Sequence, residues 1–434
     1  MKASLKLMLV SVALTPLAFY LGVLVPYVTP KNLFLRGLLF LTSLLCAVVY
    51  VREQSFRESF AKRLSHLAES PIARCLGVFL LALVASTIFA HVPSLAFFGE
   101  PTNGEGLLGL MWYFVLFFFA AMLFERREWT LFFRTTVATG AILFLIEVVQ
   151  SLLGAVRPDA LAGNPIYLAG YFLFVIFAAL MLSIEAKEKN NTALLWLSRL
   201  SVALSLIGIF ITKTRGVMLG VFAGALVALA YAALAEKQFL FGGRVLARKA
   251  ALVAAGLLIV FAGLFFVTRH APLWSHVPGL DRLAQSGAGA EGIKSRLINV
   301  RIALHAVDPA RTNAKTLVLG WGWDNYVFAW QRFYEPSLYF YDSAIFDRTH
   351  NTLADMLVMT GLLGLLAYLA LWFCFYREVF RLRSLPPAAI AAMLFWATAF
   401  FVEDLFIFNT TITFMTLFSM FAFITFLSMD SHEH

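Results

Sequence analysis

Charged residues are scarce in this chain. Asp, Glu, Lys and Arg together make up 14% of its 434 residues, whereas 61% of the residues are apolar. Too little polar surface is available to cover soluble domains, and the composition also excludes a disordered chain or a coiled coil. The net charge is +9, but the basic residues lie between apolar blocks and do not form the single water-facing patch that a nucleic-acid-binding protein needs. The composition therefore predicts a membrane protein with no nucleic-acid partner.

Cysteines and metal-ligand patterns are scarce as well. The three cysteines, Cys46, Cys75 and Cys374, are far apart in sequence and show no CxxC spacing, which excludes a secreted disulfide scaffold and gives no indication of redox or zinc chemistry. Serine-nucleophile and phosphate-loop signatures are also missing. The adjacent acids Glu403 and Asp404 are interpreted as a solvated turn, with a divalent-ion site as the minor alternative. No cofactor and no metal are expected.

Long apolar blocks are abundant. A helix needs about 20 apolar residues to cross a bilayer core of roughly 30 Å, and about twelve blocks of this kind can be counted. Together they predict an all-α polytopic membrane protein. The blocks cover residues 5–26, 33–51, 73–92, 106–124, 129–154, 166–185, 193–212, 215–235, 249–268, 350–376, 387–406 and 408–428.

The distribution of Lys and Arg in the short connections predicts the orientation. One set of connections, together with Lys2 and Lys6, holds eighteen basic residues, whereas the alternate set holds only four. By the positive-inside rule, both termini are in the cytoplasm. Residues 269–349, about eighty residues without a spanning block, then lie on the outer face and are too long for a passive connector. The expected division is residues 1–268 with spans 1–9, a helical periplasmic loop over residues 269–349, and residues 350–434 with spans 10–12.

The first candidate for chemistry is the run Lys213-Thr214-Arg215-Gly216, at the outer junction of the seventh and eighth blocks. A guanidinium near the bilayer carries a desolvation cost and normally has a partner or a ligand. Its planar fork can bind two oxygens of a diphosphate at once. Snorkelling of Arg215 to the interface is the alternative, and the sequence favours neither.

The second candidate is an amphipathic helix over residues 294–307 in the long loop. Four residues form its apolar stripe, with Arg296 and Arg301 at the two margins. These two arginines lie about 140° apart around the helix, so a single phosphate should not engage both from one face. An interfacial anchor is the preferred interpretation from spacing alone. The residues of the stripe are Leu297, Val300, Leu304 and Val307.

Aromatic residues are dense in the same loop: residues 321–346 contain eleven. A water-solvated loop would not tolerate this density. Composition does not distinguish an interfacial aromatic belt from a platform on which sugars stack.

The run Arg348-Thr349-His350-Asn351 leads into the tenth block. A histidine at a helix start, close to Arg348, experiences the positive end of the helix dipole and a second positive charge, and both favour the neutral ring near pH 7. Neutral imidazole can accept a proton, which suits a general base acting on a hydroxyl. The alternative is an interfacial histidine with a capping role.

Taken together, these segments resemble the O-antigen ligase and polymerase superfamily of bacterial membrane glycosyltransferases. The resemblance covers about residues 160–370 and depends on the order of five short motifs. They are Asn164-Pro165, Thr214-Arg215-Gly216, Ser295-Arg296, Gly320-Trp321-Gly322, and His350-Asn351 followed by Gly361-Leu362-Leu363-Gly364.

The resemblance implies a GT-C-like fold and transfer of a glycan from an undecaprenyl diphosphate carrier. It also implies that Arg215 and Arg296 hold the diphosphate and that His350 activates the acceptor hydroxyl. The secondary candidates are Lys213, Asn164, Arg301, Arg348 and Asn351. Many relatives carry an acid where this chain has Met359, and Asp355 lies about 140° from His350 around a helix, so Asp355 is not expected to replace that acid.

The expected activity is that of an O-antigen ligase: metal-independent, inverting transfer of polysaccharide to a hydroxyl of lipid A-core at the periplasmic face of the inner membrane. The expected partners are the carrier-linked glycan, lipid A-core and the phospholipid bilayer. An O-antigen polymerase or a protein O-oligosaccharyltransferase of the same superfamily is the alternative. A lipid or solute transporter is more remote, because the sequence shows neither duplicated halves nor paired helix breaks.

Overall fold

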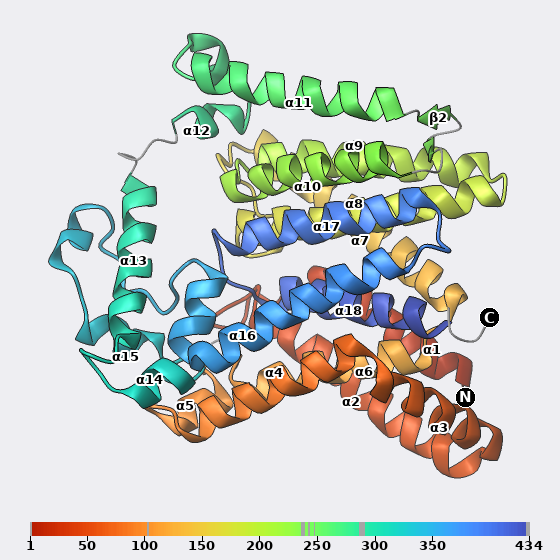
Figure 1. Ribbon diagram of the computed structural model, residues 1–434, viewed down its shortest axis with the longest axis horizontal. Helices are drawn as coiled ribbons and strands as arrows, with labels where there is room; N and C mark the ends of the chain where they lie inside the picture. The colour runs from red at the N-terminus through yellow and green to blue at the C-terminus, as the bar shows by residue number, and fades with distance from the viewer. Residues whose placement is uncertain are drawn as a thin grey trace. The chain divides into compact units, whose positions relative to one another are not determined.

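The chain folds almost entirely into helices (Figure 1). The structure is a computed structural model, and it describes residues 2–101, 104–235, 239–241, 244–246, 248–285 and 291–430. Within these ranges, the strands are β1 (Phe239–Phe241) and β2 (Arg244–Leu246), which pair as a short antiparallel hairpin. The prediction of an all-α polytopic protein is confirmed.

The described residues group into two compact units. Unit 1 comprises residues 1–20, 124–285 and 379–403. Its helix α8 packs against α7 and α9, and α10 packs against α11. The helices of unit 1 are α1 (Lys2–Val10), η1 (Ser11–Leu17), α7 (Arg126–Leu152), α8 (Pro165–Glu188), α9 (Thr192–Ile211), α10 (Arg215–Leu234), α11 (Arg248–Thr268), η2 (Pro272–His276), α12 (Leu280–Ala284) and most of α17 (Pro387–Asp404).

Unit 2 comprises residues 21–123, 286–378 and 404–434. In this unit α18 packs against α6, and Figure 1 shows α13 running across the direction of α4 and α16. The helices of unit 2 are α2 (Thr29–Arg52), α3 (Gln54–Glu69), α4 (Pro71–Ile88), α5 (Pro93–Phe98), α6 (Leu107–Leu123), α13 (Glu291–Val307), α14 (Ala314–Leu319), α15 (Tyr326–Arg332), η3 (Pro336–Phe340), most of α16 (Thr352–Arg381) and α18 (Thr411–Asp430).

Ten helices in the described ranges are long and apolar enough to cross a membrane, so the protein is a multi-pass membrane protein. Each matches one of the twelve apolar blocks to within a few residues. The other two blocks differ. One is α6, which is shorter, with 17 residues. The other, 5–26, is divided into α1 and the 3-10 helix η1, which contains Pro16. Hydropathy reports apolar length but not helix continuity, and proline interrupts the backbone hydrogen-bond ladder.

Local sequence signals explain where several spans begin. Asn164 is the N-cap of α8: its Oδ1 accepts a hydrogen bond from the backbone N–H of Ile166 at 3.0 Å, and Pro165 occupies the first helical turn. Helix α7 begins with a capping box between Glu125 and Glu128. These caps satisfy backbone groups that a helix end leaves without partners.

Burial separates central from peripheral spans. The apolar window of α18 is 89% buried and that of α8 is 78% buried, whereas only 11% of the window of α11 is buried. All three helices are apolar on every side. A helix of this composition is stable either inside protein or against lipid, so α8 and α18 form the centres of their units and α11 presents its surface to the bilayer.

Two of the cysteines meet in unit 2. Cys75 lies on α4 and Cys374 on α16, and their Sγ atoms are 2.9 Å apart, although 299 residues separate them in sequence. Both are free thiols.

Candidate functional site

In unit 1, a tight turn joins α9 to α10 and carries the first predicted cluster. Thr212 caps the end of α9, Lys213 adopts a left-handed backbone with φ of +55°, and Thr214 is the N-cap residue of α10. Arg215 is thereby the first residue of α10. A left-handed conformation is costly for lysine and occurs most often where a functional site requires it.

Basic side chains gather around this turn. Lys213 Nζ forms an ion pair of 2.9 Å with Asp281 Oδ2. Arg282 donates from Nη1 to the carbonyl of Lys213 at 3.4 Å, and Arg157 donates from Nε to the carbonyl of Thr212 at 3.2 Å. The positions of Arg157 and Arg282 in the sequence gave no signal that they belong to this cluster, because they lie in separate connections. Asn164, also in unit 1, is occupied as the cap of α8.

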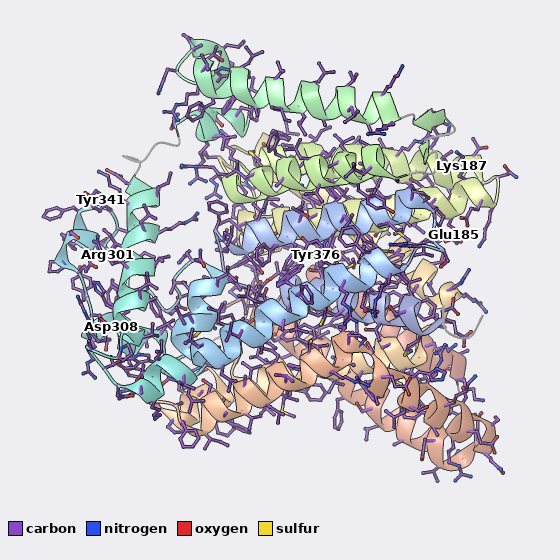
Figure 2. The ribbon with its side chains drawn as sticks, viewed as in Figure 1. Glu185, Lys187, Arg301, Asp308, Tyr341 and Tyr376 are labelled. Atoms are coloured by element: carbon purple, nitrogen blue, oxygen red, sulfur yellow. The ribbon has the colours of Figure 1, made fainter. Side chains whose placement is uncertain are left out.

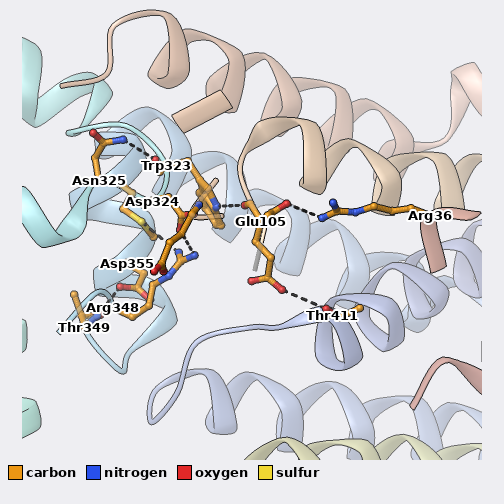
Figure 3. A network of polar contacts seen from close by, with 12 residues as sticks. Arg36, Glu105, Trp323, Asp324, Asn325, Arg348, Thr349, Asp355 and Thr411 are labelled. Atoms are coloured by element: carbon orange, nitrogen blue, oxygen red, sulfur yellow. Dashed lines mark hydrogen bonds and ion pairs between the residues drawn. The ribbon is translucent and has the colours of Figure 1, made fainter. Parts of the chain in front are cut away.

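In unit 2, Arg348 is the centre of a buried polar network (Figure 3). Its guanidinium forms an ion pair with Asp324 and lies over the rings of Trp323 and Phe408, at 5.3 and 5.7 Å from their centroids. It also donates from Nη1 to Sδ of Met359 at 3.4 Å. Burial lowers the pKa of Arg348, but nearby carboxylates, Asp324 foremost, raise it above its ordinary value. Arg348 therefore remains charged although it is buried.

Glu105 also belongs to this network, although it lies outside the motifs that the sequence analysis identified. Thr411 donates from Oγ1 to its carboxylate at 3.3 Å, and Trp323 donates from Nε1 to its backbone carbonyl at 2.8 Å. Burial raises the pKa of Glu105 to about 7, against the opposing effect of the Arg348 charge. Figure 3 shows Glu105, Trp323 and Arg348 side by side. No motif marks Glu105 in the sequence.

His350 lies next to the network. Its ring contacts the edges of Phe346 and Phe408, with centroids 5.4 and 5.3 Å away, and its Nδ1 is 3.3 Å from the carbonyl oxygen of Arg348. A neutral ring that donates from Nδ1 to this carbonyl carries its lone pair on Nε2. The Arg348 carbonyl and the two rings therefore orient the imidazole.

The reason for the neutral state of His350 differs from the predicted one. His350 is not at a helix start: its φ is +59°, and α16 begins two residues later, at Thr352. Burial is the largest cause that lowers its pKa, followed by the positive charge of Arg296. The predicted direction is confirmed, but burial is the main cause, and the positive charge that lowers the pKa is that of Arg296 and not that of Arg348.

Asn351 and Asp355 fix the turn around His350. Asn351 accepts a hydrogen bond from the N–H of Ala354 at 2.9 Å and donates to the carbonyl of Leu405 at 3.0 Å. Asp355 Oδ1 accepts from the backbone N–H of Thr349 at 2.8 Å. The prediction that Asp355 does not replace the acid found at Met359 in relatives considered only direct contact around a helix. The side chain acts on the backbone of the preceding residue instead.

The two glycine motifs of the resemblance meet in unit 2. Trp321 and Gly322 donate their backbone N–H groups to the carbonyls of Val358 and Met359, both at 2.9 Å. Gly361 has a φ of +65°, and a Cβ at this position would lie 2.3 Å from the carbonyl oxygen of Val318. Only glycine permits both this conformation and this approach of two backbones.

Arg296 and Arg301 lie on α13, and the buried face of this helix differs from the predicted stripe. Leu297 and Leu304 are 61% and 51% exposed, whereas residues with smaller or β-branched side chains are buried. The predicted stripe is therefore wrong for Leu297 and Leu304 but right for Val307, and α13 packs against α15. The buried apolar residues are Ile298, Ile302, Ala303, Ala306 and Val307.

Arg301 is engaged elsewhere. Arg301, labelled in Figure 2, donates from Nε to Oε1 of Glu335 at 2.7 Å, and its Nη2 contacts the other carboxylate oxygen. A bidentate pair of this kind occupies the Nε–Nη2 edge of the guanidinium, which is one of the edges that can bind phosphate. Arg296, by contrast, acts electrostatically on His350.

Part of the aromatic segment is core. Trp321 donates from Nε1 to the carbonyl of Ala306 at 2.9 Å, and Tyr326 donates from its hydroxyl to the carbonyl of Asn299 at 3.1 Å. Five of its eleven aromatic residues are buried in unit 2 and form core, so neither an interfacial belt nor a sugar platform describes these five, whereas Tyr339 and Phe340 are 68% and 80% exposed. The buried residues are Trp321, Trp323, Tyr326, Trp330 and Phe346.

The adjacent acids Glu403 and Asp404 are buried, at 2% and 1% exposure. Their interpretation as a solvated turn is therefore wrong. Asp404, in unit 2, accepts hydrogen bonds from Asn409 at 2.9 Å and from Thr352 at 3.2 Å. Two adjacent acids in a sequence do not indicate whether they are exposed or buried, because the residues that donate hydrogen bonds to them can lie elsewhere in the chain.

The fold and site define a multi-pass helical membrane protein with a buried ion pair beside an oriented, neutral histidine. Residues 200–369 match the family model described as O-antigen ligase. The matched range includes Arg215, Arg296 and His350, and the resemblance to the O-antigen ligase and polymerase superfamily is confirmed. No curated protein matches the chain.

Proposed function

We propose that the protein is an O-antigen ligase of the bacterial inner membrane. In this proposal it transfers O-antigen polysaccharide from undecaprenyl diphosphate to a hydroxyl of lipid A-core. Both termini lie in the cytoplasm and the active site faces the periplasm. The match of residues 200–369 to the O-antigen ligase family supports the class of reaction. The geometry of His350 supports the choice of base.

His350 is the general base in this proposal. Its lowered pKa keeps the ring neutral at the pH of the periplasm, and the contact of Nδ1 with the Arg348 carbonyl leaves the lone pair on Nε2. An imidazole that acts as a base must be neutral and must present a lone pair toward the hydroxyl that it deprotonates. Both requirements follow from burial and from one backbone contact.

Arg215 and Arg296 bind the diphosphate in this proposal, with Lys213 contributing to the positive potential. A diphosphate leaves readily, so the reaction needs charge stabilisation more than it needs proton donation to the leaving group. Guanidinium groups supply this stabilisation without a metal ion.

The bonds that change are few. The acceptor oxygen attacks the anomeric carbon of the glycan while its proton passes to Nε2 of His350. The bond between the anomeric carbon and the phosphate oxygen breaks, and undecaprenyl diphosphate leaves with its electron pair. Direct displacement of this kind inverts the configuration of the anomeric carbon.

Deletion of the gene tests the function. Loss of a ligase leaves lipid A-core without polysaccharide and leaves long polymer on the carrier. Loss of an O-antigen polymerase leaves core capped with a single repeat, and loss of a protein O-oligosaccharyltransferase leaves lipopolysaccharide intact. Electrophoresis of lipopolysaccharide, with separate analysis of carrier-linked glycan, distinguishes these outcomes.

Complementation with His350→Ala tests the base. We expect the variant to insert into the membrane at the wild-type level and to reproduce the phenotype of the deletion. Wild-type polysaccharide on lipid A-core in this strain would show that His350 is not the base. Loss of activity on addition of a chelator, with recovery on addition of magnesium, would contradict the metal-independent reaction.

A further inference from the structure

A second guanidinium, that of Arg282, lies beside Arg215 in unit 1. Arg282 belongs to the short helix α12 and donates from Nη1 to the carbonyl of Lys213, two residues before Arg215. The charge of Arg282 acts unfavourably on the guanidinium of Arg215. Two guanidinium groups held close together raise the local positive potential, which favours an anion near both of them.

Specific contacts hold Arg282 in this position. Asp281 accepts hydrogen bonds from Lys213 Nζ at 2.9 Å and from the backbone N–H of Arg282 at 2.7 Å. Burial raises the pKa of Asp281, but these hydrogen bonds keep it below its ordinary value. Gly279 has a φ of +83°, and a Cβ at this position would lie 2.2 Å from Cε of Met218 on α10. Residues 279–282 are therefore packed tightly against the start of α10.

The start of α10 is itself suited to an anion. A helix of 20 residues directs its first backbone N–H groups and the positive end of its dipole toward this point. A positive charge is unfavourable there in the absence of a ligand, yet Arg215 occupies the first position. The start of α10 and the two arginines thus both favour an anion at this position.

Thr214 provides an independent observation. As the N-cap residue of α10, it usually would accept a hydrogen bond from an N–H of the first turn, but its side chain makes no such bond. The residue is 3% exposed, and its Oγ1 has no hydrogen-bond partner in the part of the chain that the structure describes. A buried hydroxyl without a partner carries an energetic cost. A bound oxyanion would accept its hydrogen bond.

We propose that Arg282 and Thr214 join Arg215 in binding one diphosphate group at the start of α10. This inference rests on the proposed function, because the diphosphate is that of the lipid-linked donor, and it adds two binding residues. Arg282 contributes a charge-assisted hydrogen bond and Thr214 a neutral one. The ion pair between Lys213 and Asp281 positions Arg282 and does not itself contact the ligand.

Binding of undecaprenyl diphosphate without a glycan tests the proposal separately from transfer. The full-length protein is placed in phosphatidylcholine nanodiscs, and the dissociation constant is measured for wild type, Arg282→Ala, Thr214→Val and Arg311→Ala. We expect Arg282→Ala to weaken binding about tenfold, or about 1.4 kcal/mol, and Thr214→Val to weaken it about threefold. Arg311, exposed and paired with Asp308, is the matched control and should bind as wild type does.

Further binding measurements with other ligands show whether the site recognises a diphosphate, a monophosphate or anionic lipid in general. Inorganic pyrophosphate should compete with the lipid, and undecaprenyl monophosphate should bind more weakly and lose less affinity in Arg282→Ala. The proposal is overturned if Arg282→Ala binds as tightly as Arg311→Ala or if wild type binds no diphosphate lipid. It is also overturned if phosphatidylglycerol binds equally well, since that result indicates a general contact with anionic lipid.

Failure of this proposal and failure of the proposed function are distinguishable. An active His350→Ala variant would contradict the role of His350 as general base, but it would not change the expected diphosphate affinities. Normal diphosphate binding by Arg282→Ala would contradict the role of Arg282 in the diphosphate site, but His350 would still be required for transfer.

Discussion

The backbone N–H of Thr349 donates a hydrogen bond of 2.8 Å to Oδ1 of Asp355. Thr349 is fully buried, and the next residue, His350, has a left-handed backbone. Asp355 therefore holds the residue that sets the direction of the imidazole without contacting the imidazole itself. Its other carboxylate oxygen, Oδ2, is buried and has no hydrogen-bond partner among the described residues.

Substitution of Asp355 should separate its hydrogen bond from its charge. Asp355→Ala leaves the N–H of Thr349 without an acceptor, at a cost of about 1–3 kcal/mol, and we expect kcat to fall about tenfold. Asp355→Asn keeps an oxygen acceptor and should retain most of kcat. In both variants KM should change little. Equal losses in the two variants, measured by transfer to lipid A-core in vitro, would argue against a positioning role.

The pH dependence should report the charge of Arg296. Neutral His350 is the active form, so the rate falls as the pH drops through its pKa. Arg296→Gln removes a charge that lowers this pKa, so the acid limb of kcat/KM should move to higher pH. The midpoint of the limb is independent of any general loss of affinity. An unchanged midpoint in Arg296→Gln, or the same displacement in Arg311→Gln, would contradict the electrostatic link.

Gly361 should tolerate no side chain. Its positive φ costs an L-residue about 1 kcal/mol or more, and a Cβ would also collide with the backbone of Val318. We expect Gly361→Ala to lower the thermal unfolding midpoint in detergent by many degrees. Gly256 on α11, around which a Cβ would meet nothing within 4 Å, is the control. Gly256→Ala should be neutral or stabilising by up to about 1 kcal/mol, and similar losses in both variants would refute the distinction.

Oxidation should join Cys75 to Cys374. Diamide accepts one hydrogen from each thiol as a disulfide forms, and the short distance between the two Sγ atoms favours this pair. Peptide mapping of the oxidised protein should recover the Cys75–Cys374 link, which Cys374→Ser should abolish. Cys46 on α2 should remain reduced. Recovery of links to Cys46 instead would contradict the packing of α4 against α16.

The sequence predicted the spans well because two local quantities determine them. Apolar length identifies a membrane helix, and capping residues such as Asn164 and Pro165 mark its start. The interruption after α1 was missed because hydropathy does not distinguish an α-helix from a 3-10 helix.

The candidate site was predictable only in part. His350 and the basic runs are visible as residue types in unusual places. The partners that give them their properties come from other segments: Asp324 for Arg348, and Arg282 for the turn at Lys213. Pairings at such separations depend on tertiary packing, and one sequence contains no local signal for them.

Helix α11 has a consequence for how the protein responds to its surroundings. Since only 11% of its apolar window is buried, acyl chains act as its solvent over most of its length. Its main helix contact is with α10, so we expect a thinner or thicker bilayer to reorient α11 before it disturbs the buried spans. Lipid composition can thereby affect the position of residues 269–285, which follow α11 directly and include Arg282.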